Sequence, residues 1–325
     1  MTLENPRVKS MQSDAIEEIR QITLVSLNEA VASLPIEACS NSVRKFIVAA
    51  CSLGPLDHYK HFSQAARRVV DDIRALGGPE TVRTFLVAAV KQSLIDLIDG
   101  GTLERLPPRA YRHHLTQLRR IATSLPDKTR WLDVDDDLFQ KDFGLVTLRL
   151  YAAAAQLIDF RCGIPRSIVV RDGYLAAPAK VMTLLRLGGY WPFFQIHTHL
   201  SYLEEFNEDG WDECYLTCCD LYKRHPTVLG MYGSSWFYDP KLETISPRLR
   251  YLRNVPASGK AMFWLAETEG HFVQDAISTS PSRRQLYDQG KYHPRSFMML
   301  WSKRDQMRWA ENIGRQSKSS GKSVA

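Results

Sequence analysis

Two histidines separated by a single residue lie in the stretch FFQIHTHL, which runs from Phe193 to Leu200. Side chains alternate between the two faces of a β-strand, so a strand here would place Gln195, His197 and His199 on one face. Imidazoles that lie about 6 to 7 Å apart along such a face can chelate a metal ion or line a binding cleft. The alternative is that both histidines only satisfy hydrogen bonds on a half-buried strand.

An acid and a glycine follow the two histidines, at Glu204 and Gly210. The order HxH, acid, glycine resembles the first metal-binding motif of the cupin barrels. This resemblance implies a divalent metal ion bound by His197, His199 and Glu204. A metal-dependent enzyme built on this strand is therefore one hypothesis for the chain.

Acidic residues gather around the start of the next predicted helix, DGWDECYLTCCDLYKRH. Acids at a helix N-terminus complement the helix dipole, which explains most of them. A general base can still come from this region, and the candidates are His199, Glu204 and Glu205. A cysteine nucleophile would need an activating base beside it. Residues at three- and four-residue steps along the helix form a face that we expect to pack in the core: Trp211, Cys214, Tyr215, Cys218 and Tyr222.

The stretch GMYGSSWFYDP predicts a strand followed by a tight turn that contains Ser234 and Ser235. Backbone N–H groups in such a turn can bind an anion, and otherwise the turn is only structural. Arginines follow in SPRLRYLR and in SPSRRQLYDQG. Arginine near a helix N-terminus opposes the dipole, so we expect Arg253, Arg283 and Arg284 either to bind a phosphate or carboxylate of a cofactor or to form surface salt bridges.

The segment SPSRRQLYDQGKYHPRSFMMLW, from Ser280 to Trp301, resembles the closing helix and strand of the GNAT-type acyltransferases. In that family a helix ending in a pattern like LYxxxGF precedes the final strand, and its tyrosine often protonates the departing thiolate of coenzyme A. Tyr287 is the corresponding position. The nearest counterpart of the family's R/Q-x-x-G-x-G/A pyrophosphate loop is YLRNVPASGKA. The resemblance implies acyl-CoA as an anionic cofactor and a small-molecule substrate.

The elements that must position these residues change character near residue 161. Before it, the periodicity predicts amphipathic helices within residues 13–32, 57–76, 79–99 and 108–125, and a long apolar helix over 142–160. Beyond it, strands are predicted in RSIVVR, FFQIHTHL, TVLGMYGSSWF, KAMFWLAE and RSFMMLW, with helices between them. We therefore predict an α+β fold with a helical region over 1–160, a mixed α/β catalytic domain over 161–313 that the resemblance makes GNAT-like, and a disordered tail over 314–325.

Length and composition allow a sizeable core without disulfides or structural metals. The chain has 325 residues, of which 44% are hydrophobic and 24% are charged. Its six cysteines lack CxxC pairs, which indicates the reduced thiols of a cytoplasmic protein. The net charge of +6 favours anionic ligands weakly, and without a nucleic-acid-binding motif we expect no nucleic-acid partner. We also expect no secretory signal and no membrane span, which needs about 20 apolar residues in a row.

Three functions remain open at this point. The first is an acyl-CoA-dependent N-acyltransferase, in which a carboxylate or His199 deprotonates an amine and Tyr287 protonates the leaving thiolate. The second is a metal-dependent enzyme that uses the strand of His197. The third is a non-enzymatic module that binds another protein through the aromatic patch around Trp236 and Phe237.

Overall fold

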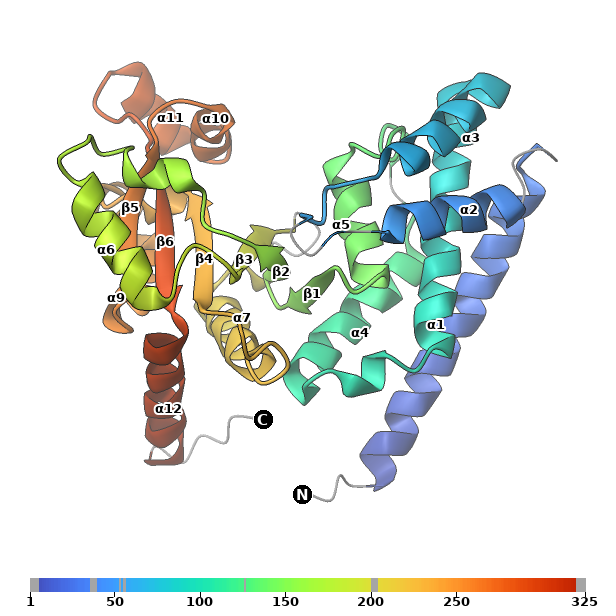
Figure 1. The fold of residues 1–325 in the computed structure, drawn as a ribbon, viewed down its shortest axis with the longest axis horizontal. Coiled ribbons are helices and arrows are strands. Elements are labelled where there is room, and N and C mark those ends of the chain that lie inside the picture. Colours follow the sequence, from blue (N-terminus) through green and yellow to red (C-terminus); the bar gives the residue numbers. More distant parts are fainter. Residues whose placement is uncertain are drawn as a thin grey trace. The chain divides into compact units, whose positions relative to one another are not determined.

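The computed structural model describes residues 6–35, 40–52, 54, 57–125, 127–199 and 204–319. The chain divides into two compact units, Met1–Ala153 and Ala154–Ala325 (Figure 1). The first unit is mainly helical and the second combines a mixed sheet with helices, so the predicted α+β class is confirmed. Among the described residues, no helix combines the length and the apolar character that crossing a membrane requires.

The first unit consists of helices followed by one short strand. Its elements are α1 (Pro6–Ala32), α2 (Ser40–Cys51), α3 (Gln64–Asp99), η2 (Leu103–Arg105), α4 (Pro108–Thr123), α5 (Asp137–Val146) and β1 (Leu150–Ala153). Helix α3 is interrupted by non-helical backbone at Gly77 and Gly78, where the sequence predicts the end of one helix and the start of another. Gly78 has a φ of 75°, which glycine adopts at little steric cost.

Phenylalanines form the centre of the first unit. Their ring centroids are 5.6 to 6.4 Å apart within the set Phe46, Phe62, Phe85, Phe139 and Phe143. The buried guanidinium of Arg149 lies 5.3 Å from the ring centres of both Phe62 and Phe143 and donates to the carbonyl oxygens of Tyr59 and His61. A charged group is tolerated in this core because its donors are satisfied and it stacks on aromatic rings.

The second unit carries the remaining strands and most of the candidate chemistry. Its elements are β2 (Gln156–Cys162), η3 (Arg166–Val169), α6 (Ala177–Leu187), β3 (Phe193–Thr198), α7 (Glu208–Leu221), β4 (Gly230–Ser235), η5 (Trp236–Tyr238), α8 (Leu242–Ile245), η6 (Pro247–Leu249), α9 (Tyr251–Ser258), β5 (Met262–Glu267), α10 (His271–Ser278), α11 (Pro281–Asp288), β6 (Ser296–Ser302) and α12 (Lys303–Ser319). The strands predicted in FFQIHTHL, TVLGMYGSSWF, KAMFWLAE and RSFMMLW are confirmed as β3 to β6.

The sheet of the second unit has the strand order β2-β3-β4-β6-β5. Only the β3–β4 pair is parallel, whereas β2 and β3, β4 and β6, and β5 and β6 pair antiparallel. Helices α7 and α12 cover one face, where Tyr222 stacks on Phe194 and Trp309 meets Trp301. On the other face, Leu184 of α6 packs in a core cluster with residues of the sheet. Both faces of the sheet are therefore covered by helices of the same unit.

Two sequence-based expectations about secondary structure are wrong. Residues 142–160 do not form one helix, because α5 ends at Val146 and two strands follow. Strands β1 and β2 are largely buried on both faces, so their apolar runs lack the alternation that distinguishes a strand from a buried helix. RSIVVR forms the 3-10 helix η3 and not a strand. Helix α12 continues to Ser319, through residues expected in the disordered tail, while 320–325 lie outside the described residues.

Candidate functional site

Strand β2 carries one extra residue opposite β3. Asp159 faces Gln195 and Cys162 faces Phe193, so β2 advances by three positions while β3 advances by two. Residues that face each other in an antiparallel pair point to the same side of the sheet, and Phe193 and Gln195 share a side because they are two positions apart. This bulge therefore places Asp159 and Cys162 on one face, although residues three apart on a regular strand point to opposite faces.

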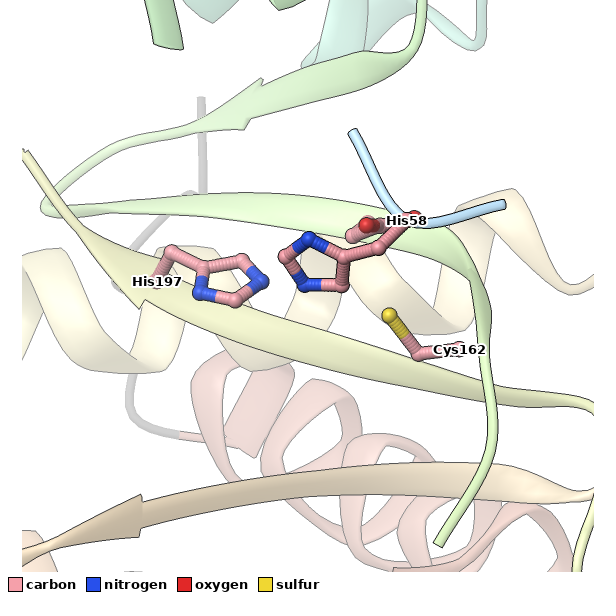
Figure 2. Close-up of side chains that lie close together, drawn as sticks. His58, Cys162 and His197 are labelled. Atoms are coloured by element: carbon pink, nitrogen blue, oxygen red, sulfur yellow. The ribbon is translucent and has the colours of Figure 1, made fainter. Parts of the chain in front are cut away.

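Asp159, Cys162 and His197 bring possible ligand atoms together on that face. Each offers one atom, a carboxylate oxygen, a thiol sulfur or an imidazole nitrogen, and these atoms lie within 4.8 Å of one another. Figure 2 shows Cys162 and His197 turned toward the same space from neighbouring strands. Asp159 and Cys162 are buried, and His197 is half-buried. The three residues thus form a compact cluster at the β2–β3 pair.

Burial and charge decide the protonation state of the cysteine in this cluster. Burial raises the pKa of the Cys162 thiol far above its usual range, and the neighbouring carboxylate of Asp159 raises it further. The thiol therefore stays protonated and donates a hydrogen bond to Asp159. Around this pair, the Asp159 carboxylate accepts from the backbone N–H of Arg161 at 2.8 Å, and the Tyr232 hydroxyl donates to Gln195 Oε1 at 2.8 Å.

A second feature is the way in which the parallel strands β3 and β4 separate. Their ladder joins Phe194 to Met231 and Gln195 to Tyr232 and extends no further among the described residues. Both strands nevertheless continue, β3 to Thr198 along β2 and β4 along β6. We call the region between residues 196–198 and 233–235 the fork. The facing backbone edges of the fork lie outside the ladder that joins the two strands.

The base of the fork is closed by Ile196 and Gly233. A Cβ atom added to Gly233 would lie 2.6 Å from Ile196 Cγ1 and 3.6 Å from the Tyr238 hydroxyl oxygen. Glycine is needed here because the Ile196 side chain occupies the space that any larger residue would use. The same distances place the buried Tyr238 hydroxyl next to the fork. Burial raises the pKa of Tyr238 far above its usual range, so this hydroxyl keeps its proton.

Helix α7, which follows the fork, has Asn207 at its N-cap. Asn207 accepts from the backbone N–H of Gly210 at 2.9 Å, and its amide donates to the carbonyl oxygen of Glu204. The helix N-terminus carries Glu208 and Asp209 in its first turn. Burial, followed by the charges of neighbouring acids, raises the pKa of Asp212 to about 6. This negative environment disfavours a phosphate at the start of α7.

The candidate bases are close to one another in the sequence, but they lie in different environments in the structure. His199 is buried and follows directly after β3. Glu204 is exposed and Glu205 is half-buried, and residues 200–203 between them and the strand lie outside the described residues. Tyr287 is half-buried on α11, where its ring stacks on His293 with centroids 5.8 Å apart.

The predicted metal ligands are arranged differently from the HxH pattern. Within the described residues, the group of possible ligands that contains His197 includes Asp159 and Cys162 of β2 and contains neither His199 nor Glu204. The helix predicted over 142–160 includes Asp159 and ends before Cys162, so neither residue was expected on a strand beside His197. The bulge that brings them together depends on pairing with β3, and no pattern within β2 alone specifies it.

The three arginines predicted to bind an anionic cofactor have distinct surroundings. Arg283 is buried and donates to the Ala276 carbonyl oxygen, Ser246 Oγ and Thr279 Oγ1, so it holds the α10–α11 region together. Arg253 is half-buried, and burial lowers its pKa. Its Nη1 donates to the Tyr238 carbonyl oxygen at 2.7 Å, and its guanidinium lies 4.1 Å from the Phe263 ring centre. Arg284 is exposed on α11.

The serines expected in a turn belong to strand β4. Ser234 faces Met298 and Ser235 faces Phe297 of β6, and the chain turns only afterwards, in η5. The prediction of a turn at these serines is therefore wrong, because pairing with β6 extends the strand through them. Both serines lie on the β4 side of the fork, where Ser234 is exposed and Ser235 is half-buried.

The cysteine-bearing face of α7 is core, as the sequence predicts. Trp211, Cys214, Tyr215, Cys218 and Tyr222 are all buried. Burial raises the pKa of Cys218 far above its usual range, which leaves a protonated thiol and no nucleophile.

A pocket of about 470 Å³ lies beside α12. It is lined by both acidic and basic side chains, among them Asp212, Asp305, Lys260 and Arg308. It shares no lining residue with the fork or with the cluster on β2 and β3.

No family model matches the chain, and no curated protein or solved structure is significantly similar to it. The chemistry of its own residues is therefore what indicates its function.

Proposed function

We propose that the second unit is a transferase that binds an acyl-coenzyme A in the fork between β3 and β4 and passes the acyl group to an amine. The observation that carries this proposal is the end of the parallel ladder after Gln195 and Tyr232, while both strands continue. Backbone N–H and C=O groups at such strand edges can pair with an extended chain that contains amides, as in strand addition. The pantetheine arm of coenzyme A is a chain of this kind.

The phosphates of the cofactor are expected on the β4 side of the fork. The acidic start of α7 opposes an anion on the β3 side. Arg253 is anchored on the carbonyl oxygen of Tyr238, three residues beyond β4, and only one of its N–H groups is used in that bond. A guanidinium has further N–H donors in a fixed plane, which suits phosphate oxygens. Arg253 is therefore the proposed phosphate-binding residue.

The proposed reaction is an acyl transfer from a thioester to an amine. The amine nitrogen attacks the thioester carbonyl carbon, the new C–N bond forms, and the C–S bond breaks. A base removes the proton of the amine, and His199 and Glu205 are the candidates at the end of β3. The leaving thiolate takes a proton from a tyrosine. Tyr238 lies beside the fork, and Tyr287 is the position that the acyltransferase resemblance implies.

Calorimetric titration of the full chain with coenzyme A and acetyl-CoA tests the binding step. We expect saturable heat, and an Arg253→Gln variant should bind about tenfold more weakly, since a lost charge-assisted contact costs about 1.4 kcal/mol. Arg284→Gln is the matched control, because the same change on exposed α11 should leave the affinity unaltered. Absence of heat at saturating concentrations of either ligand would remove the proposal.

Release of free thiol from acetyl-CoA, measured over a panel of primary amines, tests the chemistry. Tyr238→Phe should slow turnover at least about tenfold while leaving coenzyme A affinity unchanged, because a hydroxyl that only donates a proton contributes to the chemical step. Tyr287→Phe is compared in parallel. If Tyr287→Phe alone slows turnover, the proton donor is Tyr287 and the role given to Tyr238 is wrong.

A further inference from the structure

We infer that Asp159, Cys162 and His197 form a binding site for a divalent transition-metal ion, with Zn²⁺ as the best match. The inference does not depend on the proposed acyl transfer, although His197 also lies on the β3 side of the fork. It rests on the convergence of a carboxylate oxygen, a sulfur and an imidazole nitrogen within 4.8 Å of one another on one face of the β2–β3 pair.

The donor set selects the class of ion. Zinc accepts cysteine sulfur, histidine nitrogen and carboxylate oxygen at about 2.0 to 2.3 Å, usually in a tetrahedral arrangement. Two ligand atoms on such an ion are separated by roughly 3 to 4 Å, so atoms within 4.8 Å need only a small inward movement. A thiolate and an imidazole favour zinc and its neighbours over magnesium and calcium, which prefer oxygen ligands.

The backbone around the cluster orients these ligands. Asp159 and Cys162 sit on either side of the β2 bulge, and His197 projects from the adjacent strand β3. The backbone N–H of Arg161, inside the bulge, donates to one Asp159 carboxylate oxygen at 2.8 Å. Ligands carried by paired strands and held by outer hydrogen bonds lose little freedom when an ion binds. The bulge thus orients the side chains of Asp159 and Cys162 toward the same position on one face of the sheet.

Charge supplies the driving force for binding. The Asp159 carboxylate and the Cys162 sulfur are both buried, and a divalent cation between them would neutralise a buried carboxylate and thiolate together.

The cluster suits a metal ion better than it suits a cysteine nucleophile. A cysteine nucleophile must be reached by its substrate, and the Cys162 side chain is buried. A metal ion instead needs ligand atoms close together, as those of Asp159, Cys162 and His197 are.

Titration with Co²⁺ tests the site, because Co²⁺ replaces Zn²⁺ and its bond to a thiolate gives a charge-transfer absorption band. We expect the full-length chain, treated with chelator and then dialysed, to bind a stoichiometric amount of Co²⁺ with this band, and Zn²⁺ to displace it. Cys162→Ser should abolish the band, and His197→Ala should weaken binding at least about tenfold. Lack of a thiolate band in folded wild-type protein would overturn the inference.

Two matched variants show whether the effect belongs to this cluster. His199→Ala removes the other histidine of the HxH pair, and Cys218→Ser removes a buried thiol on α7. Both should keep the Co²⁺ band and its affinity, and circular dichroism should show that all variants are folded. If His199→Ala abolishes binding while His197→Ala does not, the ligands are those of the HxH pattern and the inferred site is wrong.

Discussion

Asp159 and Cys162 lie three positions apart on β2 and yet share one face of the sheet, because the bulge between them places two β2 residues opposite a single residue of β3. Regular strand geometry would send the two side chains to opposite faces. The bulge therefore converts a carboxylate and a thiol that would be separated by the sheet into neighbours of His197. It also accounts for the protonated thiol, since burial beside a carboxylate penalises a second negative charge.

The first prediction concerns the reactivity of the cysteines toward a thiol-modifying reagent near neutral pH. Cys51 is exposed and should be modified in the folded protein. The buried thiols at Cys162, Cys214, Cys218 and Cys219 should be protected until denaturant is added. Mass spectrometry of peptides after timed labelling measures each site separately. Rapid modification of Cys162 in folded protein would contradict both its burial and its protonated state.

A second prediction follows from two histidines whose pKa values are lowered. Burial lowers the pKa of His114 to about 4, and burial followed by the charge of Arg224 lowers that of His225 to about 4. Unfolded histidine has a pKa of about 6.5, so the unfolded chain binds protons that the folded chain does not. The stability that neutral histidine provides is complete above pH 6.5 and is lost as the pH falls toward 4.

For fully buried His114, this linkage amounts to about 2 kcal/mol of lost stability at about pH 5. Denaturant unfolding followed by circular dichroism at neutral pH and at about pH 5 measures the combined loss. His225→Phe keeps an aromatic ring against Phe160 and removes one titrating group, so its loss should be smaller than that of wild type. The same change at exposed His271 is the control for introducing a phenylalanine side chain.

Local sequence signals predicted those parts of the fold that depend on local chemistry. The break at Gly77 and Gly78 and strands β3 to β6 follow from glycines and short β-branched runs. Strands β1 and β2 were not predicted, because burial on both faces removes the alternation of apolar and polar residues that indicates a strand. The local sequence shows which residues prefer to be extended, but not which strand will be their neighbour.

The candidate site also depends on strand pairing that the local sequence does not specify. His197 stands out in the sequence because a second histidine follows two residues later, and the structure places it in the ligand cluster. Asp159 and Cys162 carry no such signal, since only pairing with β3 and the extra residue in β2 bring them to it. The fork likewise depends on where a parallel ladder ends, which no pattern within β3 or β4 specifies.

A third prediction concerns Asp212 on α7, whose pKa is raised to about 6 by burial and then by neighbouring acids. The folded chain holds this proton more tightly than the unfolded chain, so the associated stability is present at acid pH and is lost as the pH rises through 6. Asp212→Asn should therefore be more stable than wild type by on the order of 1 kcal/mol at about pH 7.5 and equally stable at about pH 4. Asp209→Asn, an equal charge change at an exposed position, should shift stability by less than about 0.5 kcal/mol. A gain for Asp212→Asn that persists at acid pH would rule out this linkage.

The last prediction tests the contact between Gly259, which ends α9, and Trp301 of β6. The Trp301 indole N–H donates to the Gly259 carbonyl oxygen at 2.7 Å, and a Cβ added to Gly259 would lie 2.1 Å from Trp301 Cζ2. Trp301 cannot move aside easily, because it is fully buried against Tyr215 and Trp309. Gly259→Ala should therefore destabilise the chain by about 2 to 3 kcal/mol, as overpacking of a filled core does. Gly314→Ala is the matched control, since that glycine lies in α12 with open space around it, and alanine there should stabilise by about 0.5 to 1 kcal/mol. Denaturant unfolding monitored by tryptophan fluorescence measures both changes, and a Gly259→Ala variant as stable as wild type would show that α9 does not pack on β6 in this way.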